Sequence, residues 1–142
     1  MNVLLDTNIV LDVLLDRVPH VHDSGAIWRA CDAGRCSGYI SATCLTTIYY
    51  VVGRSAGRDA ALSAVDRCLA AFEVAPVYRE TLEAARRLAG ADFEDDVQIA
   101  CAMTSFLDCI VTRDPHGFAT SSVPVLSPGL FLDHLDARRP PH

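Results

Sequence analysis

The stretch Leu4-Leu5-Asp6-Thr7-Asn8-Ile9-Val10 decides the fold. The apolar residues 3–5 predict a short buried strand, which ends directly on Asp6. Thr7 or Asp6 can cap a helix that follows at once. Apolar residues recur in this helix at helical spacing: Ile9, Val10, Val13 and Leu14. A buried strand that leads straight into a helix is typical of a parallel sheet covered by helices.

The same alternation continues along the rest of the chain. Further strands are predicted at residues 38–40, 73–75, 109–112 and 123–126. Helices are predicted at residues 20–34, 41–53 with Ser41 as its cap, 59–71, 79–88 and 127–135. Another helix begins near Phe93 and is expected to bury Val97, Ala100, Cys101 and Thr104. Short strands that alternate with longer helices predict the α/β class.

Composition predicts one folded domain. A chain of 142 residues with 51% hydrophobic and 21% charged residues can bury one core. We expect a single domain over residues 1–137 and a flexible tail over residues 138–142. The apolar runs are far shorter than the roughly 20 residues that cross a bilayer, and Asp6 interrupts the first of them. A cytoplasmic protein without a membrane partner is therefore expected.

The cysteines, the net charge and the basic residues limit which kinds of site and mechanism the chain can have. The six cysteines contain no C-x-x-C pair and most lie in apolar patterns, so buried thiols are favoured over zinc or disulfides. A net charge of −6 opposes non-specific nucleic-acid binding unless some of the acids hold a cation. All twelve basic residues are arginines, which excludes mechanisms that need a lysine.

Three aspartates stand out by their positions. Asp6 closes the first strand, Asp114 follows the strand at 109–112, and Asp95 lies in the first turn of the helix that begins near Phe93. Ligands bind outside the carboxyl ends of the strands in an open parallel sheet, so these side chains can converge. Crowded carboxylates stay ionised only beside a cation, and oxygen ligands select Mg²⁺ or Mn²⁺. Each acid alone also suits a cap or a turn; their combined placement predicts a metal site.

The motifs around these acids resemble a known family. Residues 4–11 (Leu-Leu-Asp-Thr-Asn-Ile-Val-Leu), 93–100 (Phe-Glu-Asp-Asp-Val-Gln-Ile-Ala) and 110–114 (Ile-Val-Thr-Arg-Asp) are similar in order and spacing to the motifs of PIN-domain ribonucleases, which include VapC-type toxins. The similarity spans almost the whole chain, through residues 124–128. It implies a three-layer α/β/α sandwich with a central, mainly parallel sheet. It also implies Mg²⁺- or Mn²⁺-dependent endoribonuclease activity, in which a metal-activated water attacks phosphorus.

The resemblance also implies roles for single residues. Asp6, Asp95 and Asp114 match the catalytic metal ligands of the family. Asn8 and Thr112 match positions that support the site by hydrogen bonds.

The chain departs from the family pattern in two places. Thr47 stands where most members carry a glutamate, and a hydroxyl supplies no negative charge. The acid often found just after Asp114 is replaced by residues 115–117, Pro-His-Gly. Asp96, Glu94 or Asp92 could compensate because all lie beside Asp95, although a neighbouring helix position such as Asp96 points about 100° away.

Two residues are candidates for substrate contact. Arg113 is placed beside Asp114 to meet a phosphate, with a structural ion pair as an equal alternative. His116 is a candidate contact at the rim of the site, with a plain surface histidine as the alternative. The sequence contains no basic stripe with interleaved aromatic residues, so it does not predict which RNA sequence is preferred.

Two functions remain open. One is a ribonuclease that cleaves RNA, including the toxin of a toxin–antitoxin pair; the other is a catalytically weakened PIN-fold module that binds RNA or protein, which Thr47 favours. Three other enzyme classes fit the sequence poorly. Dehalogenase-type phosphatases need a second aspartate where Asn8 stands, and receiver domains and Walker loops need a lysine, which the chain lacks. The resemblance further implies an antitoxin partner and a homodimer formed through the apolar helices at 20–34 and 41–53.

Overall fold

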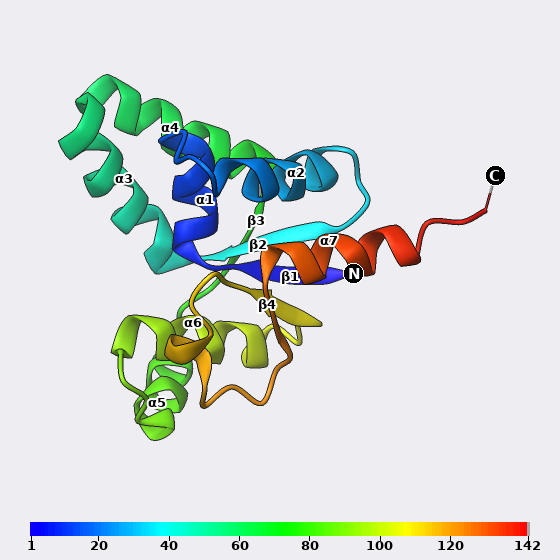
Figure 1. Cartoon of the computed structure of the whole chain (residues 1–142). Coiled ribbons are helices and arrows are strands. Elements are labelled where there is room, and N and C mark those ends of the chain that lie inside the picture. Colours follow the sequence, from blue (N-terminus) through cyan, green and yellow to red (C-terminus); the bar gives the residue numbers. More distant parts are fainter. Residues whose placement is uncertain (142) are drawn as a thin grey trace.

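The computed structural model describes residues 1–141, which form five strands, seven α-helices and one 3-10 helix. In chain order the elements are β1 (Asn2–Leu5), α1 (Thr7–Leu14), α2 (Val21–Asp32), β2 (Ser37–Ser41), α3 (Ala42–Ala56), α4 (Arg58–Ala71), β3 (Glu73–Ala75), α5 (Arg79–Leu88), α6 (Phe93–Thr104), β4 (Cys109–Val111), η1 (Pro115–Phe118), β5 (Val125–Leu126) and α7 (Pro128–Ala137). All neighbouring strands pair in parallel, in the order β3-β2-β1-β4-β5 (Figure 1).

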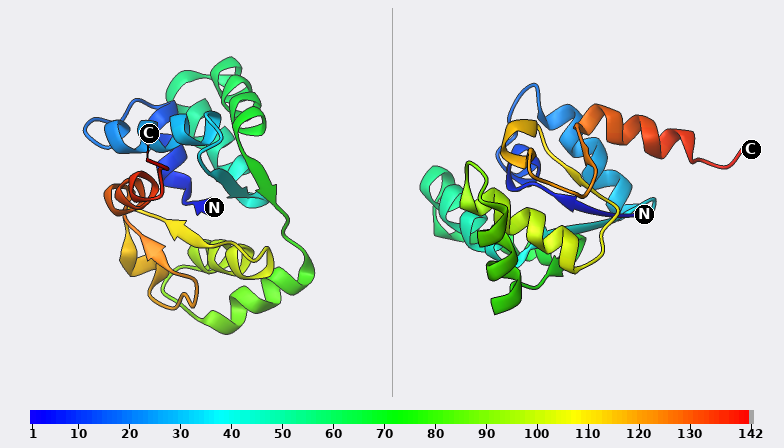
Figure 2. Two further views of the ribbon diagram at one scale, coloured as in Figure 1. Left: turned by 90° about the vertical axis from the view of Figure 1, so that its right-hand side faces the viewer. Right: turned by 90° about the horizontal axis from the view of Figure 1, so that it is seen from below.

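Helices cover both faces of this sheet. Helices α1 to α4 and α7 lie on one face, and α5 and α6 lie on the other (Figure 1), a separation that is also visible from the side in Figure 2. Val3 and Leu5 of β1 belong to the core under the first group, whereas Leu4 belongs to the core under the second. Successive side chains of a strand point to opposite faces, which explains this division. The predicted three-layer α/β/α sandwich with a parallel sheet is confirmed.

The register of the central strands aligns their carboxyl ends. Leu5 of β1 pairs with Val111 of β4, and the N–H of Asp6 donates to the carbonyl of Val111 at 3.0 Å. The residues that follow each strand, Asp6 and Thr112, therefore lie side by side at one edge of the sheet. The predicted cap Ser41 accepts the N–H of Cys44 at 3.2 Å and starts α3 at this same edge.

Besides shifts of one to three residues at the ends of other elements, three local differences from the predictions stand out. The last strand is shorter than residues 123–126, because Pro124 has no N–H to donate to a ladder and regular pairing begins at Val125. Thr104 was expected to be buried, but it is exposed at the end of α6, and its hydroxyl donates to the carbonyl of Ala100 at 2.9 Å. The 3-10 helix η1 was not predicted.

The remaining global expectations concern the tail, the cysteines and the membrane. The tail predicted at residues 138–142 follows α7, and residue 142 lies outside the described residues. All six cysteines carry free thiols, and the sulfurs of Cys31 and Cys36 lie 3.5 Å apart. None of the helices within residues 1–141 is long and apolar enough to span a bilayer.

Candidate active site

Asp6 is the buried residue at the centre of the carboxyl edge, the side of the sheet at which the parallel strands end. Its side chain follows β1, and the residue is only 5% exposed. Oδ2 accepts the hydroxyl of Thr112 at 2.8 Å, and Oδ1 accepts Nε2 of Gln98 at 3.1 Å. None of the ion pairs within residues 1–141 includes Asp6. Two neutral donors therefore hold a buried carboxylate that has no cation beside it.

Asp95 shares one of these donors. Nε2 of Gln98 also reaches Oδ1 of Asp95 at 3.4 Å, because Gln98 lies about one turn further along α6 and so on the same helix face. The pKa of Asp95 is raised to about 7, mainly by burial and to a smaller extent by the charges of Asp6, Asp92, Asp114 and Glu94. A carboxyl group with such a pKa marks a place where acids gather without a counter-ion.

Asp114, which follows β4, lies near Asp95 at the same end of the sheet. Its N–H donates to Oγ1 of Thr112 at 3.0 Å, which fixes the chain just after β4. A Cβ atom added to Gly117 would overlap Oδ2 of Asp95 and would lie 3.6 Å from Oδ2 of Asp114. The carboxylates of Asp95 and Asp114 thus flank one glycine of η1. The glycine of the Pro-His-Gly sequence allows η1 to approach these acids closely.

The donor set suits a hard divalent ion, although it does not enclose one. As the side chains lie, no three His, Cys, Asp or Glu residues within 1–141 stand close enough to hold a common ion. The groups at the edge are nevertheless all oxygen donors, the ligands that Mg²⁺ and Mn²⁺ prefer. In addition, the side chain of Gln98 contacts Asp6 and Asp95 through Nε2, and its buried Oε1 has no hydrogen-bond partner in the described chain. Crowded carboxylates and an orphaned buried oxygen fit the predicted ion.

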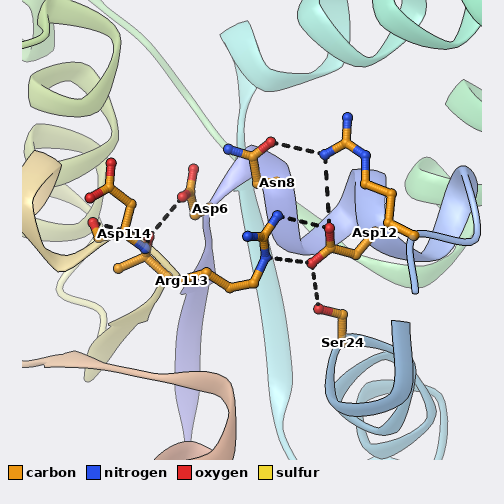
Figure 3. Close-up of polar contacts among 8 residues, drawn as sticks. Asp6, Asn8, Asp12, Ser24, Arg113 and Asp114 are labelled. Carbon is orange, nitrogen blue, oxygen red and sulfur yellow. Dashed lines mark hydrogen bonds and ion pairs between the residues drawn. The ribbon is translucent and has the colours of Figure 1, made fainter. Parts of the chain in front are cut away.

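The two residues predicted to support the site differ in what they contact. Thr112 hydrogen-bonds Asp6 directly. Asn8 stands beside Asp6 at the start of α1 (Figure 3), but its Oδ1 accepts Nη1 of Arg17 at 3.1 Å instead of binding an acid.

Arg113 lies elsewhere than its predicted substrate role requires. Its Nε and Nη2 donate to the two oxygens of Asp12 at 2.8 and 3.0 Å, turned away from Asp114 (Figure 3). Asp12 is fully buried and also accepts the hydroxyl of Ser24 at 2.9 Å. A buried carboxylate needs a cation, so Arg113 forms the structural ion pair that the sequence left as an equal alternative to a phosphate contact. The sequence offered one overlooked signal for this ion pair: Asp12 is an acid within the otherwise apolar run of residues 9–15.

Asp96 is a correction of the same kind. Although it is next to Asp95, its Oδ2 accepts the N–H of Gly90 at 3.0 Å, and a Cβ atom on Gly90 would overlap its Oδ1. Asp96 therefore faces the loop between α5 and α6 and stabilises that loop. It does not support the cluster around Asp6.

Thr47 and His116 occupy the rim. The half-buried Thr47 donates its hydroxyl to Oε1 of Glu94 at 3.4 Å and lies 3.5 Å from the carbonyl of Thr43. His116 is exposed in η1, and none of the side-chain hydrogen bonds described within residues 1–141 involves it. Gln98, which bridges two of the acids, was missed as a functional candidate.

A parallel α/β/α sandwich with aspartates gathered where β1, β4 and α6 meet is the architecture of a PIN-type protein. A PIN domain family model matches residues 2–116, and the chain belongs to the PIN domain family. A search of curated protein sequences gave no match.

Solved structures with the same fold include several toxin proteins. DNA-bound VapBC from Salmonella typhimurium has a TM-score of 0.70 at 14% identity and covers 90% of this chain and 98% of its own. VapC20 from Mycobacterium tuberculosis, a Sarcin-Ricin loop cleaving toxin, has a TM-score of 0.68 at 15% identity, with coverages of 82% and 93%. A toxin-antitoxin complex from Klebsiella pneumoniae has a TM-score of 0.65 at 20% identity, with coverages of 89% and 97%. At these identities the likeness concerns the fold.

Proposed function

We propose that this PIN-domain protein is a metal-dependent endoribonuclease that hydrolyses RNA phosphodiester bonds. One observation carries the proposal: Asp6 and Asp95 share the amide of Gln98, and Asp114 lies beside Asp95 at Gly117. None of the ion pairs within residues 1–141 neutralises these acids. Unneutralised acids at the carboxyl edge of a sheet cost stability, and a bound cation would relieve their repulsion.

The residues divide the work in a defined way. Asp6, Asp95 and Asp114 would hold Mg²⁺ or Mn²⁺. A bound ion of this kind lowers the pKa of a water molecule and shields the charge of the phosphate. Thr112 and Gln98 each donate to one oxygen of Asp6 and so fix the orientation of its carboxylate. The exposed His116 remains our candidate for a contact with RNA from the rim of the site.

We further propose that the protein is the toxin of a toxin–antitoxin pair. The Klebsiella pneumoniae structure of the same fold is a toxin-antitoxin complex, which supports an antitoxin as the partner. A homodimer stays part of the proposal. Of the two helices expected to form it, α3 carries a tyrosine, Tyr50, that is 67% exposed.

The alternative is a PIN domain that binds RNA or protein and cleaves poorly. The uncharged Thr47 at the rim favours this function, as does the open arrangement of the acids. Metal dependence separates the two functions, because a binding module needs no ion at Asp95.

The decisive experiment is RNA cleavage by the purified protein with Mn²⁺, Mg²⁺ or EDTA, on single-stranded and structured RNAs. We expect cleavage only with a divalent ion. Asp95→Asn should lower the rate roughly 100-fold or more, since metal ligation supplies several kcal/mol to the transition state. Asp136→Asn, which changes an exposed acid paired with Arg35, is the control and should cleave like the wild type. Equal cleavage by Asp95→Asn and wild type would identify a contaminating nuclease and contradict the proposal.

A further inference from the structure

Three acids in the sequence around Asp95 could add a charge to the proposed ion site. Asp92 and Glu94 precede Asp95, and Asp96 follows it. Charge alone does not separate them, because all three lie at the start of α6. Their hydrogen bonds do separate them.

Two of the three acids are already committed to the backbone. Asp92 is the cap of α6, and its Oδ1 accepts the N–H groups of Glu94 at 2.8 Å and Asp95 at 3.3 Å. Asp96 holds the N–H of Gly90. These bonds fix the preceding loop and the helix start. The second oxygen of Asp96, Oδ1, has no hydrogen-bond partner but is packed against Gly90 of that loop.

Glu94 alone of the three reaches across to another element at the edge. Its Oε1 lies 3.4 Å from the hydroxyl of Thr47 on α3, and no other side-chain hydrogen bond holds it within residues 1–141. Burial is the main cause that raises the pKa of the Cys44 thiol on α3 to about 12, and the charges of Asp6 and Glu94 are among the smaller causes in the same direction. Glu94 and Asp6 thus approach the same part of α3.

The buried amide of Gln98 is the second observation that points to a ligand. The residue is 2% exposed, and its Nε2 contacts both Asp6 and Asp95, while its Oε1 has no hydrogen-bond partner in the described chain. A buried oxygen without a hydrogen-bond partner lowers stability, and a bound ion or its water can supply the missing partner. The acidic edge is therefore set up for a ligand and is more than a group of solvated charges.

We propose that Glu94 is a further carboxylate ligand of the ion and that the hydroxyl of Thr47 positions it. In this arrangement the additional negative charge comes from the first turn of α6, and α3 supplies a hydrogen-bond donor. The inference rests on the proposed function, because it concerns the same ion. It also explains how a threonine at position 47 is compatible with a working site.

The test is the Mn²⁺ affinity of the intact chain, measured by isothermal titration calorimetry without RNA. We expect Glu94→Gln to weaken Mn²⁺ binding about tenfold or more, as loss of a supporting or ligating group does. Glu80→Gln is the matched control, because Glu80 is an exposed glutamate in the first turn of α5 and meets the same helix dipole. It should bind Mn²⁺ like the wild type.

Position 47 provides a second, independent readout. Thr47→Val should weaken Mn²⁺ binding several-fold, whereas Thr47→Ser, which keeps the hydroxyl, should retain it. In the Glu94→Gln protein, adding Thr47→Glu should restore affinity, because a carboxylate returns to the other side of the 3.4 Å contact. Thermal unfolding in EDTA checks that each variant folds.

The outcomes separate this inference from the proposed function. Binding that is lost in Asp95→Asn but unchanged in Glu94→Gln overturns the role of Glu94 and leaves the nuclease proposal intact. Glu94 would then act only on the helix dipole, as Glu80 does. Absence of Mn²⁺ binding in the wild type overturns both.

Discussion

Asp6, directly before α1, and Asp12, within α1, are both buried aspartates, and their surroundings are opposite. Asp12 is fully buried and meets the guanidinium of Arg113 through two bonds, at 2.8 and 3.0 Å. Asp6 is 5% exposed and meets only the neutral donors Gln98 and Thr112. Figure 3 shows both carboxylates in one view: Asp12 is bonded to Arg113, and Asp6 lies beside Asp114.

This contrast separates structure from function within a single residue type. A buried carboxylate paired with arginine holds elements together, here α1 and the segment after β4. A buried carboxylate beside other acids costs stability, and such groups cluster at functional sites. Environment, and not residue identity, therefore marks Asp6 as the candidate for chemistry and Asp12 as a structural anchor.

The largest expected effect is the loss of the anchor. Asp12→Asn should lower the free energy of unfolding by about 3–5 kcal/mol, because it leaves the guanidinium of Arg113 without its buried partner. Asp6→Asn should change it by less than about 1 kcal/mol, since removing one charge also relieves repulsion with Asp95. Urea denaturation of both variants in EDTA measures the difference.

An exposed ion pair of the same length is the control for this prediction. Arg35 and Asp136 also lie 2.8 Å apart, but their side chains are 31% and 67% exposed. Asp136→Asn should cost under about 1 kcal/mol because solvent screens the pair. If Asp12→Asn costs no more than Asp136→Asn, the distinction between the two buried aspartates fails.

The fold was predictable wherever local signals set it. The strand Glu73–Ala75 and the helix Arg79–Leu88 match their predicted bounds, and Ser41 caps α3 as expected. The 3-10 helix η1 was not predictable, because its position depends on Gly117 packing against Asp95, a contact between distant segments. Thr104 fits the apolar spacing of α6 but comes where the helix leaves the core.

The site was predictable only in its outline. The ends of parallel strands meet at one edge, so Asp6 and Asp114 could be brought together from the sequence. Their role as metal ligands stays a prediction. Gln98 could not be singled out, because a glutamine within a helix carries no positional signal. The partner of Arg113 lies 101 residues away, so the sequence left phosphate contact and ion pair as equal alternatives.

A smaller effect concerns the pH dependence of the acidic cluster. The pKa of Asp95 is raised from 3.8 to about 7 in the folded state. Between these values the folded protein binds more protons than the unfolded chain, so stability falls as pH rises through that window. In EDTA, ionisation of Asp95 should lower the free energy of unfolding by about 1–2 kcal/mol as the pH rises from 5 to about 8. This figure allows for solvent screening at a part-exposed group.

Urea denaturation across this pH range should show a flatter profile for Asp95→Asn than for the wild type. The variant should also be the more stable protein above about pH 7, because it cannot ionise. Asp133→Asn, an exposed acid on α7, should keep the slope of the wild type. Parallel profiles for wild type and Asp95→Asn would show that Asp95 ionises freely and that the acids are not crowded.

The smallest expected effect tests whether Arg113 alone neutralises the charge of Asp12 or whether Arg17 is also needed. Nη1 of Arg17 lies 3.8 Å from Asp12, with a side chain that is 34% exposed, and it donates to Asn8 at 3.1 Å. Arg17→Met keeps much of the apolar stem and should cost less than about 1 kcal/mol in urea denaturation. Arg113→Met should cost several times more, because it removes both short bonds to a fully buried carboxylate. Equal costs would mean that the two arginines neutralise Asp12 jointly, and the anchor would then extend to Asn8, directly beside the acidic cluster.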